Sequence, residues 1–294
     1  MQNNKYFVGT AGWSYKDWAP SFYPKNQSGS FDWLQFYSHY FNCVEVNSTY
    51  YTYISPKVVQ GWLNKVSDVD DFLFTVKLHQ DFTHKKNYNQ QNIKDVSQNL
   101  QILSEGERLG GLLFQFPYSF AYNDSNVKYV KELKDIFQNY ICFIEVRHKS
   151  WNNWDAYNLF NQQNLIYTSI DQPQIGQSLY FKPVVINGIG YIRFHGRNKE
   201  AWLKSIQNFG KKQTYDQRNE RYDYLYSPGE IVEIIQLIKP LLDKVKELFI
   251  ILNNHPKGNA VVNAFQFMNH FESKKVVIPV NTLKSFPQLS DIAE

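Results

Sequence analysis

The chain has 294 residues, of which 43% are hydrophobic and 20% charged, and its formal net charge is +4. This composition is that of an ordinary globular protein, and the length fits a single (β/α) barrel. The modest charge is unlike the basic stripe of a dedicated nucleic-acid-binding protein, which disfavours a nucleic-acid partner without excluding one. No apolar run reaches the roughly 18–20 residues that a membrane-spanning helix needs.

Eight apolar, strand-like segments recur along the chain, beginning near residues 5, 42, 72, 111, 141, 165, 189 and 248. Helical spacing of apolar residues between them predicts helices over residues 31–41, 56–66, 92–103, 126–137, 228–242 and 259–271. We expect the fifth of these to begin at the capping box Ser227-Pro228-Gly229-Glu230 and to bend at Pro240.

The gaps between strand starts are mostly 25–40 residues, which is the length of a strand, a helix and two loops. The pattern therefore predicts an α/β fold, a TIM-barrel-like (β/α)8 parallel barrel that forms one domain over residues 1–294. An open doubly wound sheet is the alternative. It would carry a glycine-rich phosphate fingerprint after the first strand, and Gly9-Thr10-Ala11-Gly12 is not that fingerprint.

A polar, aromatic-rich insertion at about residues 196–227 interrupts this spacing. It follows the carboxyl end of a predicted strand, so we expect it to hang over the mouth of the barrel as a lid or binding loop. Between residues 211 and 226 its four basic residues are offset by three acidic ones. This balance gives little support to a nucleic-acid interface.

The two cysteines, Cys43 and Cys142, each lie inside a strand-like run. Their number and spacing predict neither a disulfide framework nor a cysteine metal site. The first five residues lead straight into a predicted strand with no apolar signal core. We therefore expect a cytoplasmic protein without a membrane partner.

Charged or amide side chains stand at the end of nearly every predicted strand. All carboxyl ends of a parallel barrel point to one face, and strand residues two apart share one side of the sheet. The pairs that should point together are Glu45 and Asn47, Lys77 and His79, Glu145 and Arg147, and Arg193 and His195. We expect these side chains to converge on one pocket at the mouth.

Proton transfer is the chemistry that the strand-end acids and imidazole favour. The predicted catalytic residues are Glu45, Glu145, Asp171 and His195. Cationic, amide and aromatic side chains around them would hold a substrate and stabilise developing negative charge. This predicted binding set comprises Trp13, Asn47, Tyr50, Lys77, Gln115, Arg147, Arg193, Asn253 and Asn254.

Three other interpretations of the same residues stay open. Glu145, Asp171 and His195 resemble part of the divalent-metal site of xylose-isomerase-like barrels, although the eighth strand offers Asn253 and Asn254 where a further acid usually stands. Paired glutamates also suit glycoside hydrolysis. Lastly, the strand-end charges can form a structural network that plugs the barrel, although burying ions costs several kcal/mol.

Ordered sequence blocks resemble a known family, the DUF72 (YecE-like) proteins. The matching blocks run from about residue 7 to 264 and include Gly9–Trp18, Phe22–Pro24, Glu45–Tyr51, Phe74–Lys77, Thr83-His84, Leu113–Pro117, Glu145–Trp151, Arg193–Asn198, Tyr222–Tyr226 and Asn253–His255. The resemblance implies a TIM-barrel-like fold. It does not imply a particular reaction, because the name of the family itself states that its function is unassigned.

These observations lead to one main hypothesis and one alternative. The main hypothesis is an enzyme, of isomerase or hydrolase type, that uses acid/base chemistry on a small polar, anionic substrate of the sugar or phosphate type. A divalent metal is the one cofactor that the residues suggest. The alternative is a non-catalytic binder of a nucleotide, a sugar or RNA that uses the same mouth.

Overall fold

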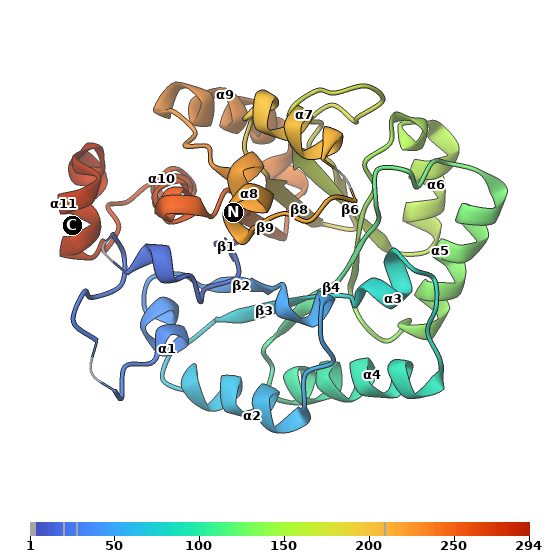
Figure 1. Cartoon of the computed structure of the whole chain (residues 1–294), viewed down its shortest axis with the longest axis horizontal. Helices are drawn as coiled ribbons and strands as arrows, with labels where there is room; N and C mark the ends of the chain where they lie inside the picture. The colour runs from blue at the N-terminus through green and yellow to red at the C-terminus, as the bar shows by residue number, and fades with distance from the viewer. Residues whose placement is uncertain (1–3, 20, 28, 209) are drawn as a thin grey trace.

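Eight parallel strands close into a barrel in the computed structural model, which describes residues 4–19, 21–27, 29–208 and 210–294 (Figure 1). The strands are β1 (Lys5–Ala11), β2 (Cys43–Val46), β3 (Leu73–Lys77), β4 (Leu109–Gln115), β5 (Cys142–Glu145), β6 (Leu165–Asp171), β8 (Ile189–Phe194) and β9 (Glu247–Leu252). β1 pairs with β2 and β9, and the pairing of β6 with β8 closes the ring. The predicted parallel barrel is confirmed.

Helices between consecutive strands cover the outside of the barrel (Figure 1). Those matching predicted segments are α1 (Trp33–Ser38), α2 (Pro56–Lys65), α4 (Gln90–Glu105), α5 (Asp124–Ile136), α9 (Pro228–Ile238) and α10 (Asn259–Glu272). The prediction missed α3 (Gln80–Thr83), α6 (Trp154–Gln162), α7 (Lys199–Gln207), α8 (Tyr215–Asn219), α11 (Val280–Ser285) and β7 (Val185–Ile186). Most of these elements are short, so they carry too few apolar residues to show a period.

Local interactions determine both ends of helix α9. The Ser227 hydroxyl accepts a hydrogen bond from the Glu230 amide, and the Glu230 carboxylate accepts one from the Ser227 amide, as expected of a capping box. The α-helix ends at Ile238 and continues as the 3-10 helix η5 (Lys239–Lys244), which contains Pro240. Since proline has no amide hydrogen and its ring crowds the preceding turn, it ends the α-helix rather than bending it.

Stacked aromatic rings fill the lower part of the barrel. Phe7 stacks on Phe249 with ring centroids 4.8 Å apart, and Phe143 stacks on Tyr191 at 4.0 Å. Gly110 leaves room for these rings, since a Cβ there would lie 3.1 Å from the Phe249 ring. This dense apolar floor confines polar side chains to the carboxyl end of the barrel.

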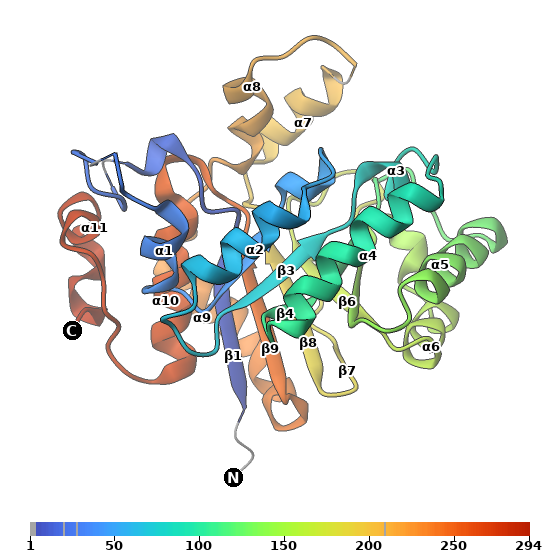
Figure 2. The same cartoon turned by 90° about the horizontal axis from the view of Figure 1, so that it is seen from below.

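The segment that follows β8 lies beyond this carboxyl end. Figure 2 shows α7 and α8 on the side of the barrel opposite the N-terminus. The 3-10 helix η4 (Glu220–Tyr222) follows α8 directly. Among the described residues, no helix is both long and apolar enough to span a membrane.

The remaining short 3-10 helices lie in loops. They are η1 (Lys16–Trp18), η2 (Ser48–Tyr50), η3 (Lys149–Trp151), η6 (Pro256–Gly258) and η7 (Pro287–Ile292). Of these, η2 follows β2 and lies next to β3, because the Thr49 hydroxyl donates a 2.7 Å hydrogen bond to the Lys77 carbonyl. This bond fixes the position of η2 at the mouth of the barrel.

Candidate functional site

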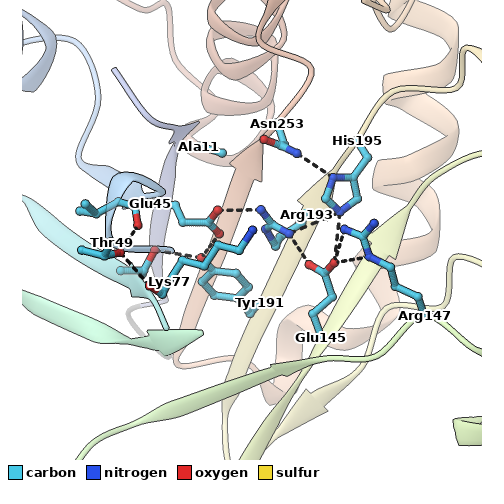
Figure 3. Close-up of polar contacts among 12 residues, drawn as sticks. Ala11, Glu45, Thr49, Lys77, Glu145, Arg147, Tyr191, Arg193, His195 and Asn253 are labelled. Atoms are coloured by element: carbon cyan, nitrogen blue, oxygen red, sulfur yellow. Dashed lines mark hydrogen bonds and ion pairs between the residues drawn. The ribbon is translucent and has the colours of Figure 1, made fainter. Parts of the chain in front are cut away.

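A buried arginine joins two strands across the mouth of the barrel (Figure 3). Arg193, at the end of β8, is 1% exposed, and Glu45 on β2 and Glu145 on β5 are fully buried. Arg193 Nη2 lies 2.6 Å from Glu45 Oε1, and Arg193 Nη1 donates to Glu145 Oε2. Face alternation along each strand brings these three side chains inside the barrel.

A hydroxyl pair holds the second oxygen of Glu45. Tyr191 Oη donates to Glu45 Oε2 at 2.9 Å and lies 2.9 Å from Thr75 Oγ1. Burial and the neighbouring Glu45 carboxylate raise the pKa of Tyr191 well above its usual value. The phenol therefore stays protonated, and both oxygens of Glu45 are engaged by donors.

A second arginine completes the contacts of Glu145. Arg147 donates from Nε at 2.8 Å and from Nη2 at 2.6 Å to Glu145 Oε1. Burial alone would raise the pKa of Glu145, but Arg193 and Arg147 outweigh it and hold this pKa well below the usual value. The carboxylate is therefore ionised, and a continuous chain of charges runs from Glu45 through Arg193 and Glu145 to Arg147.

His195 lies against this chain of charges as a neutral imidazole. Its Nδ1 is 2.8 Å from Asn253 Nδ2, and its Nε2 is 3.6 Å from Glu145 Oε1. Burial lowers the pKa of His195 to about 3, although Glu145 opposes the shift. The same Nε2 lies 3.4 Å from Arg193 Nη1, so the imidazole faces both the carboxylate and the guanidinium of this chain of charges.

Three basic side chains and one tyrosine form what we call the cationic corner: Lys77, His84, Arg147 and Tyr50. The half-buried Lys77 places Nζ 4.2 Å from the centroid of the Tyr50 ring, and the His84 ring lies 5.0 Å from the same ring. Among the described residues, no carboxylate lies within ion-pair distance of Lys77 Nζ. An ammonium here is therefore held by a tyrosine ring and not by a counter-ion.

Electrostatics in the cationic corner disfavour further positive charge. Burial and the Arg193 guanidinium lower the pKa of Lys77 to about 7, against the opposing pull of Glu45 and Glu145. Burial, Lys77 and Arg147 lower the pKa of His84 to about 4. At neutral pH, Lys77 is thus divided between its two protonation states, while His84 is neutral.

The structure does not bring Asp171 to this group, so its placement in the catalytic set needs correction. In the pairing of β6 with β8, Ile170 lies opposite Arg193 and Asp171 lies opposite Phe194. Register partners in parallel strands point to the same side of the sheet, so Asp171 faces away from the barrel interior. Its carboxylate accepts hydrogen bonds from Arg197 at 2.9 Å and from Tyr226 at 2.5 Å.

The same geometry corrects the predicted metal ligands. Glu145 and His195 are neighbours, but the Asp171 carboxylate lies on the other face of the sheet. Across the described residues, no three His, Cys, Asp or Glu side chains are grouped to hold a metal ion. The donor set of Glu145, Asp171 and His195 therefore does not fit a divalent metal.

Two predicted amides are committed to contacts within the fold. Asn254 donates to the Tyr224 carbonyl and to Asn263 Oδ1, both at 2.8 Å, and so connects the end of β9 to α10. Gln115 donates to the Phe116 carbonyl at 2.7 Å. Gln115 nevertheless lies in register with Glu145 and on the same side of the sheet. Asn254 therefore lies outside the site, whereas Gln115 borders it.

Other predicted binding residues lie at the edge of the mouth. Trp13 is half-buried and packs edge-on against Trp62, with ring centroids 5.8 Å apart. Asn47 follows β2, and its Oδ1 is buried without a hydrogen-bond partner among the described residues. This oxygen is one of the acceptors that a ligand could satisfy.

Sequence reasoning missed two polar residues of the site, Tyr191 and Thr75. Both stand two positions before a predicted site residue, Arg193 and Lys77, and therefore share its face. The alternation that placed the charged residues predicts these hydroxyls as well. Tyrosine and threonine are also common in barrel strands, so their residue type alone does not single them out as part of a site.

Comparisons with known proteins agree with this architecture. The family model described as "Protein of unknown function DUF72" matches residues 7–288. The UPF0759 protein YunF of Bacillus subtilis strain 168 is 28% identical over 276 residues, covering 89% of this chain and 93% of that protein.

Two crystal structures share the fold. A DUF72 family protein from Thermotoga maritima MSB8 is 30% identical with a TM-score of 0.78, covering 92% of this chain and all of that one. A DUF72 family protein from Enterococcus faecalis V583 is 22% identical with a TM-score of 0.76, covering 91% of this chain and 95% of that one. The match of the family model over nearly the whole length confirms the resemblance, and this chain belongs to the DUF72 family of proteins of unknown function.

Proposed function

We propose that this protein is an enzyme that transfers a proton to or from a small anionic substrate at the carboxyl end of the barrel. Lys77 carries the proton, and Arg147 with neutral His84 binds the anionic group. The observation that supports this most is the half-buried Lys77 amino group, which stands over a tyrosine ring in the cationic corner and has no paired carboxylate in the part of the chain that the structure describes.

Lys77 suits proton transfer better than Glu145 does. A general acid or base works best when its pKa lies near the working pH, and Lys77 has a pKa of about 7. Glu145 has a pKa far below that, and both its oxygens are bound by arginines. A glycosidase acid would need a raised carboxyl pKa, so Glu145 does not suit that role.

The charge of the site favours an anion. With Lys77 protonated, three cations (Lys77, Arg147 and Arg193) face two carboxylates (Glu45 and Glu145), an excess of one positive charge. Arg147 retains some exposure, with 13% of its side chain accessible. A phosphate or carboxylate near Arg147 and Lys77 would relieve their mutual repulsion, so its binding should raise the pKa of Lys77.

His195 and Asn253 serve a different purpose in this proposal. The neutral imidazole is fully buried beside Glu145, with Asn253 bound to its Nδ1. The imidazole does not ionise near neutral pH, so in this proposal it does not donate a proton to the substrate. Its role is to support the ion chain that positions Arg147. This assignment replaces the role of acid that the sequence suggested.

A substrate screen with charge-matched variants tests the proposal. Purified protein is incubated with a panel of sugar phosphates and small carboxylic acids, and proton and phosphorus NMR follow conversion. We expect Lys77→Met and Lys77→Arg each to lower turnover by roughly 10²–10⁴-fold, the usual contribution of general acid–base catalysis. Lys77→Arg should still bind the substrate, because it keeps the positive charge.

The outcomes separate the two functions. Turnover that survives in Lys77→Arg would remove Lys77 as the proton carrier. Binding of panel members without conversion by the wild type would instead favour a non-catalytic binder at the same mouth. If Arg147→Gln bound the anions as tightly as the wild type, the cationic corner would not be the anion site.

A further inference from the structure

The insertion after β8 carries a stacked group of three side chains, Trp202, Arg221 and Tyr222. The Arg221 guanidinium lies 4.7 Å from the Tyr222 ring centroid and 5.2 Å from that of Trp202. The Trp202 and Tyr222 rings lie 5.9 Å apart, edge to face. Because Trp202 belongs to α7 and Tyr222 to η4, this group joins the two ends of the insertion into one unit.

This stacked group faces the candidate site directly. The Tyr222 ring centroid lies 6.2 Å from that of His195 and 5.8 Å from that of His255, and Trp202 lies 6.5 Å from His195. His195 contacts Glu145 and Asn253 in the ion chain. The insertion therefore forms an upper wall of the same mouth, as Figure 2 shows for α7 and α8 above the strand ends.

A second aromatic wall stands on the β2 side. Tyr51 is 69% exposed and meets Tyr50 edge to face at 4.8 Å. Tyr50 in turn contacts Lys77 and His84 of the cationic corner. Tyr51 therefore stands at the same mouth as the upper wall, on its β2 side.

Three polar atoms in or beside the upper wall have no hydrogen-bond partner among the described residues. His255 is 6% exposed, and its Nδ1 makes no hydrogen bond within the described part of the chain. The same holds for the buried Nε1 of Trp202 and Nε of Arg221, both of which are donors. Buried polar groups in folded proteins are nearly always hydrogen-bonded to protein, water or a ligand, so these atoms are available to bind polar groups from outside the chain.

We propose that the ligand is a phosphate ester whose organic group contains a ring, and that the upper wall contacts this ring. The ring lies between Tyr51 and Tyr222, and the phosphate is bound in the cationic corner by Lys77 and Arg147. This inference rests on the proposed function, because it takes the same site and names the class of its substrate. Trp202 Nε1 and Arg221 Nε supply hydrogen bonds to polar substituents of the ring.

Three probes that share a phosphate and differ in the attached group test this inference. Isothermal titration calorimetry measures the affinity for methyl phosphate, phenyl phosphate and glucose 6-phosphate. An aromatic contact predicts that at least one ring phosphate binds about tenfold tighter than methyl phosphate. The identity of the preferred probe distinguishes an aromatic ring from a sugar ring, and either preference supports the inference.

Matched substitutions assign the preference to the two walls. Tyr222→Leu should abolish it while leaving methyl phosphate affinity unchanged, and Tyr222→Phe should keep the preference for phenyl phosphate because the ring remains. Tyr51→Leu, at a position that is 69% exposed, should weaken the same preference. Arg147→Gln should weaken all three probes alike.

The contrary results fall into two groups. If the wild type bound all three probes equally, or if both Tyr222→Leu and Tyr51→Leu kept the preference, the ring site would be wrong while the anion site of the proposed function stood. If the wild type bound none of the probes, both the inference and the proposed anion site would fall.

Discussion

Two ionic clusters lie on opposite sides of the same barrel wall, and they differ in how completely their charged groups are paired. The outer cluster consists of Asp171, Arg197 and Glu230, with Tyr226 and Tyr224 as hydroxyl donors. Arg197 binds Asp171 at 2.9 Å and Glu230 at 3.0 Å, Tyr226 donates to Asp171, and Tyr224 donates to Glu230. Each carboxylate there is bound by both a guanidinium and a tyrosine hydroxyl. The cluster thereby connects the start of the insertion to its end.

The inner cluster has the same types of residue but a different balance. Arg193 and Arg147 occupy the carboxylates of Glu45 and Glu145, and Lys77 beside them has no carboxylate within ion-pair distance among the residues that the structure describes. Burial, together with the neighbouring Arg193 guanidinium, lowers the pKa of Lys77. Charged side chains at a strand end therefore do not by themselves mark a functional site. A partly exposed cation without a counter-ion is the better sign.

The largest expected effect is that of Arg193→Met, which leaves two carboxylates buried without their shared partner. We expect a loss of about 3–5 kcal/mol in the free energy of unfolding, as is typical when one member of a buried ion pair is removed. Urea unfolding followed by tryptophan fluorescence measures it. A loss below about 1 kcal/mol would mean that the mouth rearranges freely, which is incompatible with a preorganised site.

Tyr191→Phe should have the next largest effect, because it removes only the hydroxyl that donates to Glu45. A hydrogen bond to a charged group contributes about 1.5–3 kcal/mol, and we expect a loss in that range by the same urea titration. Thr75→Val, which removes the neighbouring hydroxyl, is the matched control and should cost less, because its partner is a neutral phenol. Equal losses would contradict the special role of the Glu45 contact.

Arg197→Gln tests the outer cluster and should cost about 1 kcal/mol, because this side chain is about one-third exposed and its ion pairs are partly screened. We expect faster hydrogen–deuterium exchange confined to α7, α8 and η4, since Arg197 ties the ends of the insertion together. Phosphate binding in the cationic corner should persist. An exchange pattern spread over the barrel strands would show that the two clusters are coupled.

Lys77→Met should change how the free energy of unfolding depends on pH, an effect that is measured as a slope over a pH range and not as a loss at one pH. The unfolded chain holds the lysine proton up to about pH 10.4, whereas folded Lys77 releases it near pH 7. Between these values unfolding takes up a proton, so Lys77 makes the free energy of unfolding rise with pH. The variant should lack this rise when unfolding is measured from pH 7 to 10. Parallel pH profiles would show that Lys77 has an ordinary pKa.

Much of the architecture could be predicted from the sequence. Strand starts near 5, 42, 72, 165 and 189 agree with the observed starts to within one residue, because the spacing of apolar residues reflects the alternation of strands and helices. Alternation likewise placed Glu45, Glu145 and Arg193 on one side of their strands. Each of these inferences needs only local geometry, which the chain carries in its own order of residues.

Only the tertiary structure decided which strand-end groups act together. Asp171 looked equivalent to Glu145, but the register of β6 against β8 turned it to the outer face, where Arg197 holds it. Register depends on hydrogen bonds between strands that are distant in sequence. The protonation of Lys77 and His195 likewise depends on burial and on charges brought near by closing the barrel, and no local pattern of residues encodes those distances.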